Sequence, residues 1–164
     1  LIYGLSQDQI DNIFDKLGSI FEHVPHECPV GQIDQLQELI NKRVNEPTLG
    51  VILPTGLAQL FTIRGTNYES DWGLMGTSEA WILQEKILNP VLGQSLKDHI
   101  NYVHDNSTFS ERLENSKGQI GFLMRPFPLD DFKRITDSGK RLPPKSTFFY
   151  PKLSTGIVIN KFLD

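Results

Sequence analysis

The 164-residue sequence has a single cysteine, Cys28, so no internal disulfide can hold the fold. Such cysteine usage fits a reducing cytoplasm. No apolar run approaches the roughly 20 residues that a membrane-spanning helix needs, and no basic segment precedes an apolar one at the start, as it would in a signal peptide. We therefore expect a cytoplasmic protein without a membrane partner. Because the sequence opens on Leu1 rather than Met, we also expect a fragment or a processed form.

The sequence also lacks the glycines of a phosphate-binding P-loop. Lys145-Ser146-Thr147 has the lysine and hydroxyls that end such a loop, but Pro143 and Pro144 precede it. A P-loop needs consecutive backbone N–H groups facing the phosphates, and proline has none. A P-loop is therefore excluded, whereas a cationic, hydroxyl-bearing strand is not.

Paired metal-ligand spacings are missing too. His23, His26 and Cys28 are three potential ligands within six residues, but a closed structural zinc site needs four. Neither a Cys-x-x-Cys nor a His-x-x-x-His pair accompanies them. We read residues 25–29 as a loop bounded by two prolines, with His23 just before it and His26 within it, and we predict no metal site.

Charge is unevenly distributed along the chain. The net charge is −4, yet residues 1–116 carry 7 basic and 16 acidic side chains, and residues 117–164 carry 9 and 4. A basic segment of this kind can mark an anion-binding face, or it can simply attract the acidic remainder of the fold. The overall acidity, and the absence of a helix lined with Arg or Lys, count against nucleic acid as a partner.

Hydrophobic periodicity and turn residues predict an α+β fold with a mixed sheet, β-hairpins and about five helices. No repeat or long linker divides the chain, so we expect one compact domain over residues 1–164. Ser6 and Gln9 form a capping box for the first helix, and Gly18 ends it. The expected helices cover residues 6–18, 33–44, 77–89, 108–117 and 129–139, and the expected strands cover 20–24, 49–53, 57–63, 99–104 (weak), 119–124, 146–150 and 157–162.

Residues 142–156 form the most informative segment. They combine lysines, hydroxyls and three consecutive aromatic residues between prolines, and an unpaired lysine is costly to bury. One interpretation is that lysines converge on a phosphate or carboxylate above an aromatic surface. The other is an edge hairpin whose lysines stay in solvent and discourage edge pairing. The candidate ligand-binding residues are Arg141, Lys145, Ser146, Thr147, Tyr150 and Lys152.

Two further groups could carry chemistry. His104 beside Asp105 suggests a general base, although Asp105 is equally suited to cap the helix that follows it. Trp81 lies on an apolar helical face typical of the core. Trp72, in a glycine-flanked segment without periodicity, is the better candidate for an exposed ligand contact.

Several segments together resemble the C-terminal half of the bacterial and archaeal "domain of unknown function 1015" proteins. They are residues 82–93, 100–103, 121–123 before a proline-rich turn, and above all 142–156 with the pattern Pro-Lys-Ser-Thr, Pro-Lys-Leu and a closing glycine. Leu142 stands where the family often has Met, and Gly76-Thr77-Ser78 replaces its usual Leu-Asp-Val.

The resemblance implies a bacterial protein about twice as long as this chain and without a settled biochemical role. Family members carry an upstream Gly-His-His-Arg-Tyr element, similar to one in ParB-like and free-serine-kinase-like proteins, and this chain lacks it. The chain would then be the companion of an upstream half. It would contribute an anion-binding surface to a composite site for a phosphate-bearing small molecule or nucleotide.

A second hypothesis makes the chain a non-catalytic interaction or dimerisation module. In that case the aromatic residues of the C-terminal hairpin would contact another chain, such as a second copy in a homodimer.

Overall fold

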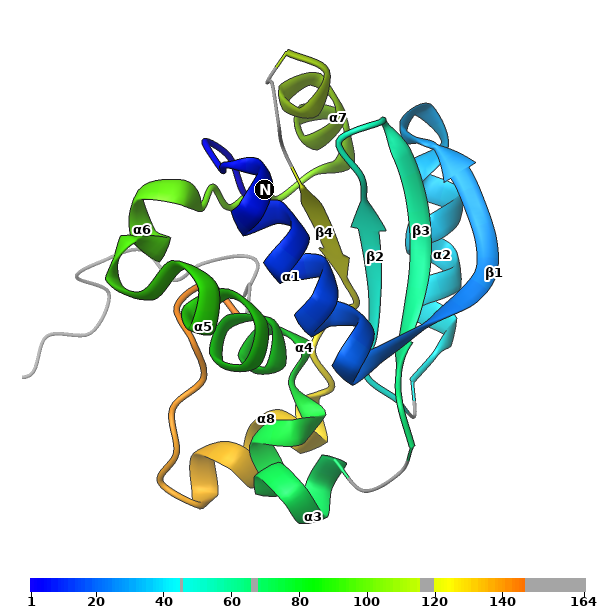
Figure 1. The fold of residues 1–164 in the computed structure, drawn as a ribbon. Helices are drawn as coiled ribbons and strands as arrows, with labels where there is room; N and C mark the ends of the chain where they lie inside the picture. Colours follow the sequence, from blue (N-terminus) through cyan, green and yellow to red (C-terminus); the bar gives the residue numbers. More distant parts are fainter. Residues whose placement is uncertain (45, 66–67, 116–119, 147–164) are drawn as a thin grey trace, which may run out of the picture.

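The computed structural model describes residues 1–44, 46–65, 68–115 and 120–146. Within these residues the centre of the fold is a four-stranded sheet in the order β1-β3-β2-β4, and each neighbouring pair is antiparallel. Figure 1 shows the strands side by side, with β4 at one edge and β1 at the other. The strands are β1 (Phe21–Pro29), β2 (Thr48–Ile52), β3 (Leu57–Ile63) and β4 (Gly121–Met124).

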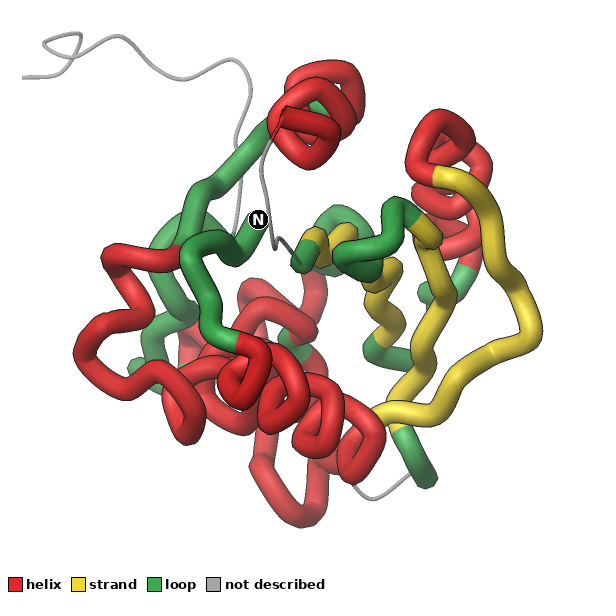
Figure 2. Tube along the Cα trace, turned by 45° about the horizontal axis from the view of Figure 1, so that its top comes forward, coloured by secondary structure: helices red, strands yellow, loops and turns green. Residues whose placement is uncertain are grey.

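Helices cover both faces of this sheet, so the described fold is α+β with a helical layer on each side (Figures 1 and 2). The α-helices are α1 (Gln7–Ile20), α2 (Ile33–Lys42), α3 (Tyr68–Trp72), α4 (Glu79–Trp81), α5 (Asn89–Leu92), α6 (Leu96–His99), α7 (Asn106–Asn115) and α8 (Leu129–Asp137). Short 3₁₀ turns cover Val30–Gln32, Gly73–Thr77 and Gly93–Ser95, and a π-helical stretch covers Ile82–Leu88.

Successive strand residues feed two separate cores, because side chains alternate between the faces of a strand. Leu49 and Val51 of β2 pack with α1 and the helical run from α4 to α5, whereas Ile52 packs with α2 and α7. In β4, Phe122 belongs to the first core and Leu123 to the second. The sheet is thus buried on both sides.

Local signals fix the start of α1. Ser6 accepts a hydrogen bond from the Gln9 amide, and the Gln9 side chain bonds the Ser6 amide, which confirms the predicted capping box. The predicted end at Gly18 is wrong, since the helix runs on to Ile20. Glycine weakens a helix without breaking it, and Leu17 is buried in the core here.

The predicted loop between Pro25 and Pro29 is also wrong. Strand β1 runs through both prolines and pairs with β3 along its length. Proline cannot donate to a neighbouring strand, but β1 is an edge strand, and its register shifts between Val24 and Glu27. The edge position and this irregularity accommodate the two prolines, which a central strand would exclude.

The third helical region starts as predicted and continues further than predicted. Ser78 accepts a hydrogen bond from the Trp81 amide and caps α4. The helix does not stop near Pro90, because a π-helical stretch leads into α5 and Pro90 stands in the first turn of that helix. A missing N–H is tolerated at this position.

Other elements follow the sequence closely. The hairpin of β2 and β3, the second helix and the fifth helix lie where the pattern predicts them. Residues 99–104 form only an isolated bridge at Ile100 instead of a strand. Asp105 caps α7 by accepting the Thr108 amide at 2.7 Å, and the helix begins at Asn106, two residues before its predicted start. The strands predicted at 146–150 and 157–162 lie outside the described residues, apart from Ser146, which belongs to a turn.

We predict that Gly76→Ala destabilises the fold by about 1–3 kcal/mol in urea denaturation. A Cβ atom at this position would lie 2.4 Å from the Tyr68 carbonyl oxygen, so backbone would have to move. Gly18→Ala is the matched control, because nothing lies within 4 Å of the point that its Cβ atom would occupy, and alanine favours the helix. That variant should gain about 0.5–1 kcal/mol. Equal effects of the two substitutions would contradict this packing.

Candidate functional site

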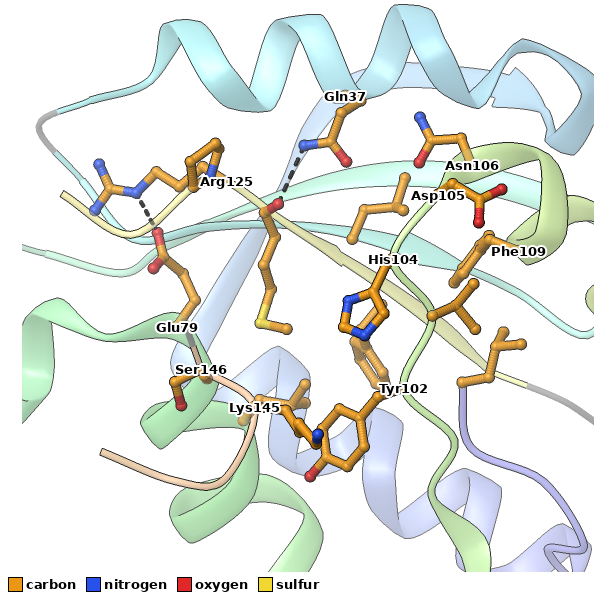
Figure 3. A pocket seen from close by; sticks show the side chains of 18 of the residues that line it. Gln37, Glu79, Tyr102, His104, Asp105, Asn106, Phe109, Arg125, Lys145 and Ser146 are labelled. Carbon is orange, nitrogen blue, oxygen red and sulfur yellow. Dashed lines mark hydrogen bonds and ion pairs between the residues drawn. The ribbon is translucent and has the colours of Figure 1, made fainter. Parts of the chain in front are cut away.

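A cavity of about 960 Å³ lies beside the free edge of β4. Its walls come from α2, from the helical run that starts at α4, from β4 and the turn after it, from residues 100–107, and from residues 143–146 (Figure 3). Segments far apart in the sequence thus meet at one sheet edge. The size suits a small molecule or a short extended peptide.

One end of this cavity is closed by a single strand-like rung. Ile2 bridges Ile120 on one side and Ile100 on the other, both antiparallel. Ile2 and Ile120 exchange two hydrogen bonds of 2.8 and 3.0 Å between their amides and carbonyls. Leu1 and Asn101 exchange two more, each 2.8 Å long. Residues 1–3 therefore lie between Ile120, which directly precedes β4, and residues 99–101, and are paired with both by main-chain hydrogen bonds.

Beyond Leu1 the space between these two segments continues along β4. In an antiparallel pair, successive residues turn their N–H and C=O groups to alternate sides. Ile120 bonds Ile2, so Gly121 and Leu123 face β2, and the N–H and C=O of Phe122 face the cavity. No described group pairs with them there. We call the space between Phe122 and Val103 the edge slot.

The far end of the edge slot is partly occupied by a side chain. Gln37 of α2 donates a hydrogen bond of 3.1 Å to the Met124 carbonyl oxygen (Figure 3). The same amide also donates to Asn41. This bond pairs the Met124 carbonyl, one of the main-chain groups of β4 that face the cavity. The main-chain groups of Phe122 lie between this bond and the bonds that pair Ile120 with Ile2.

A buried ion pair forms the wall at the end of β4. Nε of Arg125 lies 2.5 Å from Oε1 of Glu79, and the two side chains are 4% and 2% exposed. The same guanidinium donates to the carbonyl oxygens of Arg43 and Val44. The Thr48 amide donates to Glu79 at 3.3 Å. The pair thereby ties α4 to β2, to β4 and to the end of α2.

Burial dominates the electrostatics of Glu79. Removal from water raises the pKa of this carboxyl, while Arg125 and the hydrogen bonds to the carboxylate act in the opposite direction. The ionised carboxylate therefore depends on its guanidinium partner. With both charges facing each other, Arg125 is not free to hold a ligand.

Lys145 also lines the cavity but, unlike Arg125, it is not neutralised by a carboxylate among the described residues. It lies in a turn in which the Ser146 amide and hydroxyl both donate to the Pro143 carbonyl oxygen, at 3.3 and 2.7 Å. Its φ of +63° is in the left-handed region, which is uncommon for residues other than glycine. Across residues 1–146 no acidic group described by the structure pairs with its ammonium.

The opposite rim of the cavity is polar and already partnered. Asp105 accepts bonds from Ser107 and Thr108, which lower the pKa of its carboxyl. Asp34 accepts a 2.7 Å bond from Asn106. Asp105 is thus engaged as a helix cap, which confirms that interpretation of the residue. His104 lines the same rim, and Figure 3 shows its ring extending into the cavity.

The predicted ligand-binding residues divide into three groups. Lys145 and Ser146 line the cavity. Arg141 is exposed and does not line it. Thr147, Tyr150 and Lys152 lie outside the described residues, so their predicted roles, and that of the C-terminal hairpin, stay predictions.

The three potential metal ligands do not converge. His23 packs against Phe61, with ring centroids 5.5 Å apart, and lies 3.7 Å from Glu27. Cys28 is buried in the core next to α2, and burial raises the pKa of its thiol. Among the residues that the structure describes, no three His, Cys, Asp or Glu side chains are placed to hold a metal ion.

The two tryptophans lie together, contrary to the separate roles predicted for them. Trp72 is part of α3, its ring centroid is 6.3 Å from that of Trp81, and both pack against the first core. The Lys86 ammonium lies over both rings, 5.6 and 5.0 Å from their centroids. Trp72 therefore supports the helical layer and is not an isolated exposed contact.

No motif in the sequence marks Glu79, Arg125 or the edge slot. Glu79 follows a helix cap, where an acidic residue is ordinary. The sequence feature that could have indicated the buried pair is Arg125, a lone arginine that follows an apolar strand and directly precedes a proline. The edge slot has no local signal, since it depends on the meeting of residues 1–3 with two distant segments.

Comparison with known proteins found no matching family, no similar curated protein and no similar solved structure. The resemblance described above therefore stays a prediction. Separately, no helix in the described ranges is long and apolar enough to cross a bilayer.

We predict that Arg125→Met lowers the free energy of unfolding by about 3–5 kcal/mol at pH 7, because it leaves the Glu79 carboxylate buried without a partner. Loss of Arg125 raises the pKa of Glu79 further above its unfolded value. The native state then binds more protons than the unfolded state, so the deficit grows as the pH rises from about 4 towards 7. Urea denaturation across this pH range measures it.

Two further variants make this measurement specific. Adding Glu79→Gln to Arg125→Met should recover much of the loss at pH 7 and flatten its pH dependence. Arg134→Met is the control, because the Arg134 side chain is half exposed where it pairs with Glu69 and Asp131, and its loss should cost less than about 1 kcal/mol. A loss at Arg125 no larger than at Arg134 would contradict a structural role for the buried pair.

Proposed function

We propose that the cavity beside β4 binds an anionic ligand, whose phosphate or carboxylate is held by Lys145, with Ser146 next to it in the same turn. The ligand class is a phosphate-bearing small molecule, a nucleotide or a carboxylate. If the resemblance holds, this bacterial, cytoplasmic chain supplies the surface to a composite site that an upstream half completes.

The observation that supports this proposal most directly is that the Lys145 ammonium is not paired with a carboxylate in the described part of the chain. Its ammonium has no acidic partner among the described residues and belongs to a side chain that lines the cavity. A charge-assisted hydrogen bond to a phosphate or carboxylate would use it. The nearby guanidinium of Arg125 cannot serve, since Glu79 neutralises it.

The backbone at Lys145 adds a second argument. A left-handed lysine is strained relative to glycine or asparagine at the same place, and strain of this kind concentrates at functional sites. The turn also places the Ser146 hydroxyl next to the lysine, although this hydroxyl donates to Pro143 and is left with acceptor capacity only. Lysine is therefore the principal donor to the ligand.

Lys145→Asn tests the proposal, because asparagine keeps the left-handed backbone and removes the charge. We expect this variant to bind inorganic phosphate or acetate at least about tenfold more weakly than the wild type, as loss of one charge-assisted hydrogen bond implies. NMR titration of the full chain measures both anions, and the wild-type affinity should fall with added salt.

Lys133→Gln is the control, because Lys133 is exposed on α8 and does not line the cavity. Its affinity for either anion should equal that of the wild type. Equal affinities of the wild type and Lys145→Asn for both anions would overturn the proposal.

A further inference from the structure

We propose that the anion held at Lys145 is the head group of an amphipathic molecule, whose alkyl or aryl body lies against the apolar side chains that follow β4. This inference names the ligand class of the proposed function and rests on it. The head group is a carboxylate or a phosphate monoester, and the body of the molecule is apolar instead of a sugar or a nucleobase.

Apolar side chains gather in the cavity where the chain leaves β4. The strand ends at Met124, and the turn after it and the start of α8 line the cavity with four residues, which we call the apolar wall. They are Pro126, Phe127, Leu129 and Phe132. Most small-molecule sites present such a surface together with a few polar groups that fix the orientation of the ligand.

The apolar wall lies at the end of β4 that is remote from the start of the chain. Ile2 pairs with Ile120, just before the strand begins, whereas the apolar wall follows Met124 at the other end (Figure 1). Lys145 lines the same cavity, as do the two prolines that directly precede it. Contact between a ligand and the apolar wall therefore does not depend on the space beside Leu1.

Leu129 is the residue that most clearly marks the apolar wall as a contact surface. Its side chain is 60% exposed in the first turn of α8, a helix whose buried residue is Ile135. A single exposed leucine is ordinary on a protein surface. This one lines a cavity together with the half-buried Phe127, and apolar surface grouped at a concave site is typical of a binding region.

The polar side chains next to the apolar wall are bonded to the protein itself. Gln37 donates to Asn41 and to the Met124 carbonyl oxygen. Arg125, directly before the apolar wall, is paired with Glu79. A sugar or a nucleobase placed here would exchange its hydrogen bonds to water for groups that are already engaged, which weakens binding. An alkyl or aryl body has no polar groups to satisfy.

The charge of Lys145 alone is a weak source of affinity. Its side chain is exposed, and water and salt screen the attraction between exposed charges. Contact with the apolar wall adds a hydrophobic contribution that grows with the area removed from water. An amphipathic anion uses both features of the cavity, whereas inorganic phosphate or acetate uses only the ammonium.

The test titrates the full chain by NMR with acetate, butanoate and octanoate, each below the concentration at which it forms micelles. One buried methylene group strengthens binding about fourfold. Octanoate has four more methylene groups than butanoate and should bind at least about tenfold more tightly, even if the body is only partly covered. Octyl phosphate and adenosine monophosphate test the other head group. We expect octyl phosphate to bind more tightly than inorganic phosphate, and adenosine monophosphate to bind no more tightly than inorganic phosphate.

Two exposed apolar residues provide a matched pair of variants. Leu129→Ser removes part of the apolar wall and should weaken octanoate binding about threefold or more, with acetate binding unchanged. Val44→Ser is the control, because Val44 is 61% exposed and does not line the cavity. It should change neither affinity. Equal affinities of the two variants for octanoate would overturn the inference.

The outcomes separate this inference from the proposed function. Octanoate that binds no more tightly than acetate, while both depend on Lys145, would overturn the amphipathic ligand and support the proposed function. Adenosine monophosphate that binds more tightly than octyl phosphate would do the same. Anion binding that is unchanged in Lys145→Asn for every probe, or absent from the wild type, would overturn both. Affinity that rises with chain length and falls in Lys145→Asn would support both.

Discussion

Main-chain groups at the edge of a sheet must be paired, covered or exposed to water, and this constraint shapes the molecule around β4. At the opposite edge, β1 carries Pro25 and Pro29 and an irregular register, features that discourage further pairing. Along the edge of β4, Ile2 pairs with Ile120 just before the strand, and the Gln37 side chain donates to the carbonyl oxygen of Met124 at its end. Between them Phe122 faces a cavity instead of bulk solvent.

The buried Glu79–Arg125 pair lies in the wall of the cavity, at the end of β4. It joins α4 to the turn after β4 and to the neighbouring strand, so the helical wall is fixed relative to the sheet edge. Removing one partner of such a pair destabilises the fold even where the intact pair contributes little net stability, because the remaining charge is then buried without a partner. A rigid wall of this kind suits a preformed binding site, in which less ordering is needed when the ligand binds.

The sequence was informative where local chemistry decides the structure. The capping box at Ser6, the hairpin of β2 and β3 and the cap at Asp105 depend on neighbouring residues, and the structure has all three. Predictions from the sequence were wrong where the place of a segment in the fold overrides its local conformational preference. Pro25 lies in a strand because that strand is at an edge, and the helix continues past Gly18 because Leu17 is buried.

The site was only partly predictable for the same reason. Lys145 and Ser146 were found because lysine beside hydroxyls and prolines is an unusual local combination. Glu79 and Arg125 are 46 residues apart, and their pairing follows from the packing of a helix against the end of a strand. The edge slot requires three segments to meet, which no local pattern encodes.

Amide hydrogen exchange in the chain alone, read residue by residue by NMR, tests the open edge of β4 most directly. The Leu123 amide faces β2 and should be protected, whereas the Phe122 amide faces the cavity and should exchange much faster. Protection of Phe122 equal to that of Leu123 would show that this edge is already paired, and would contradict a slot open to a ligand.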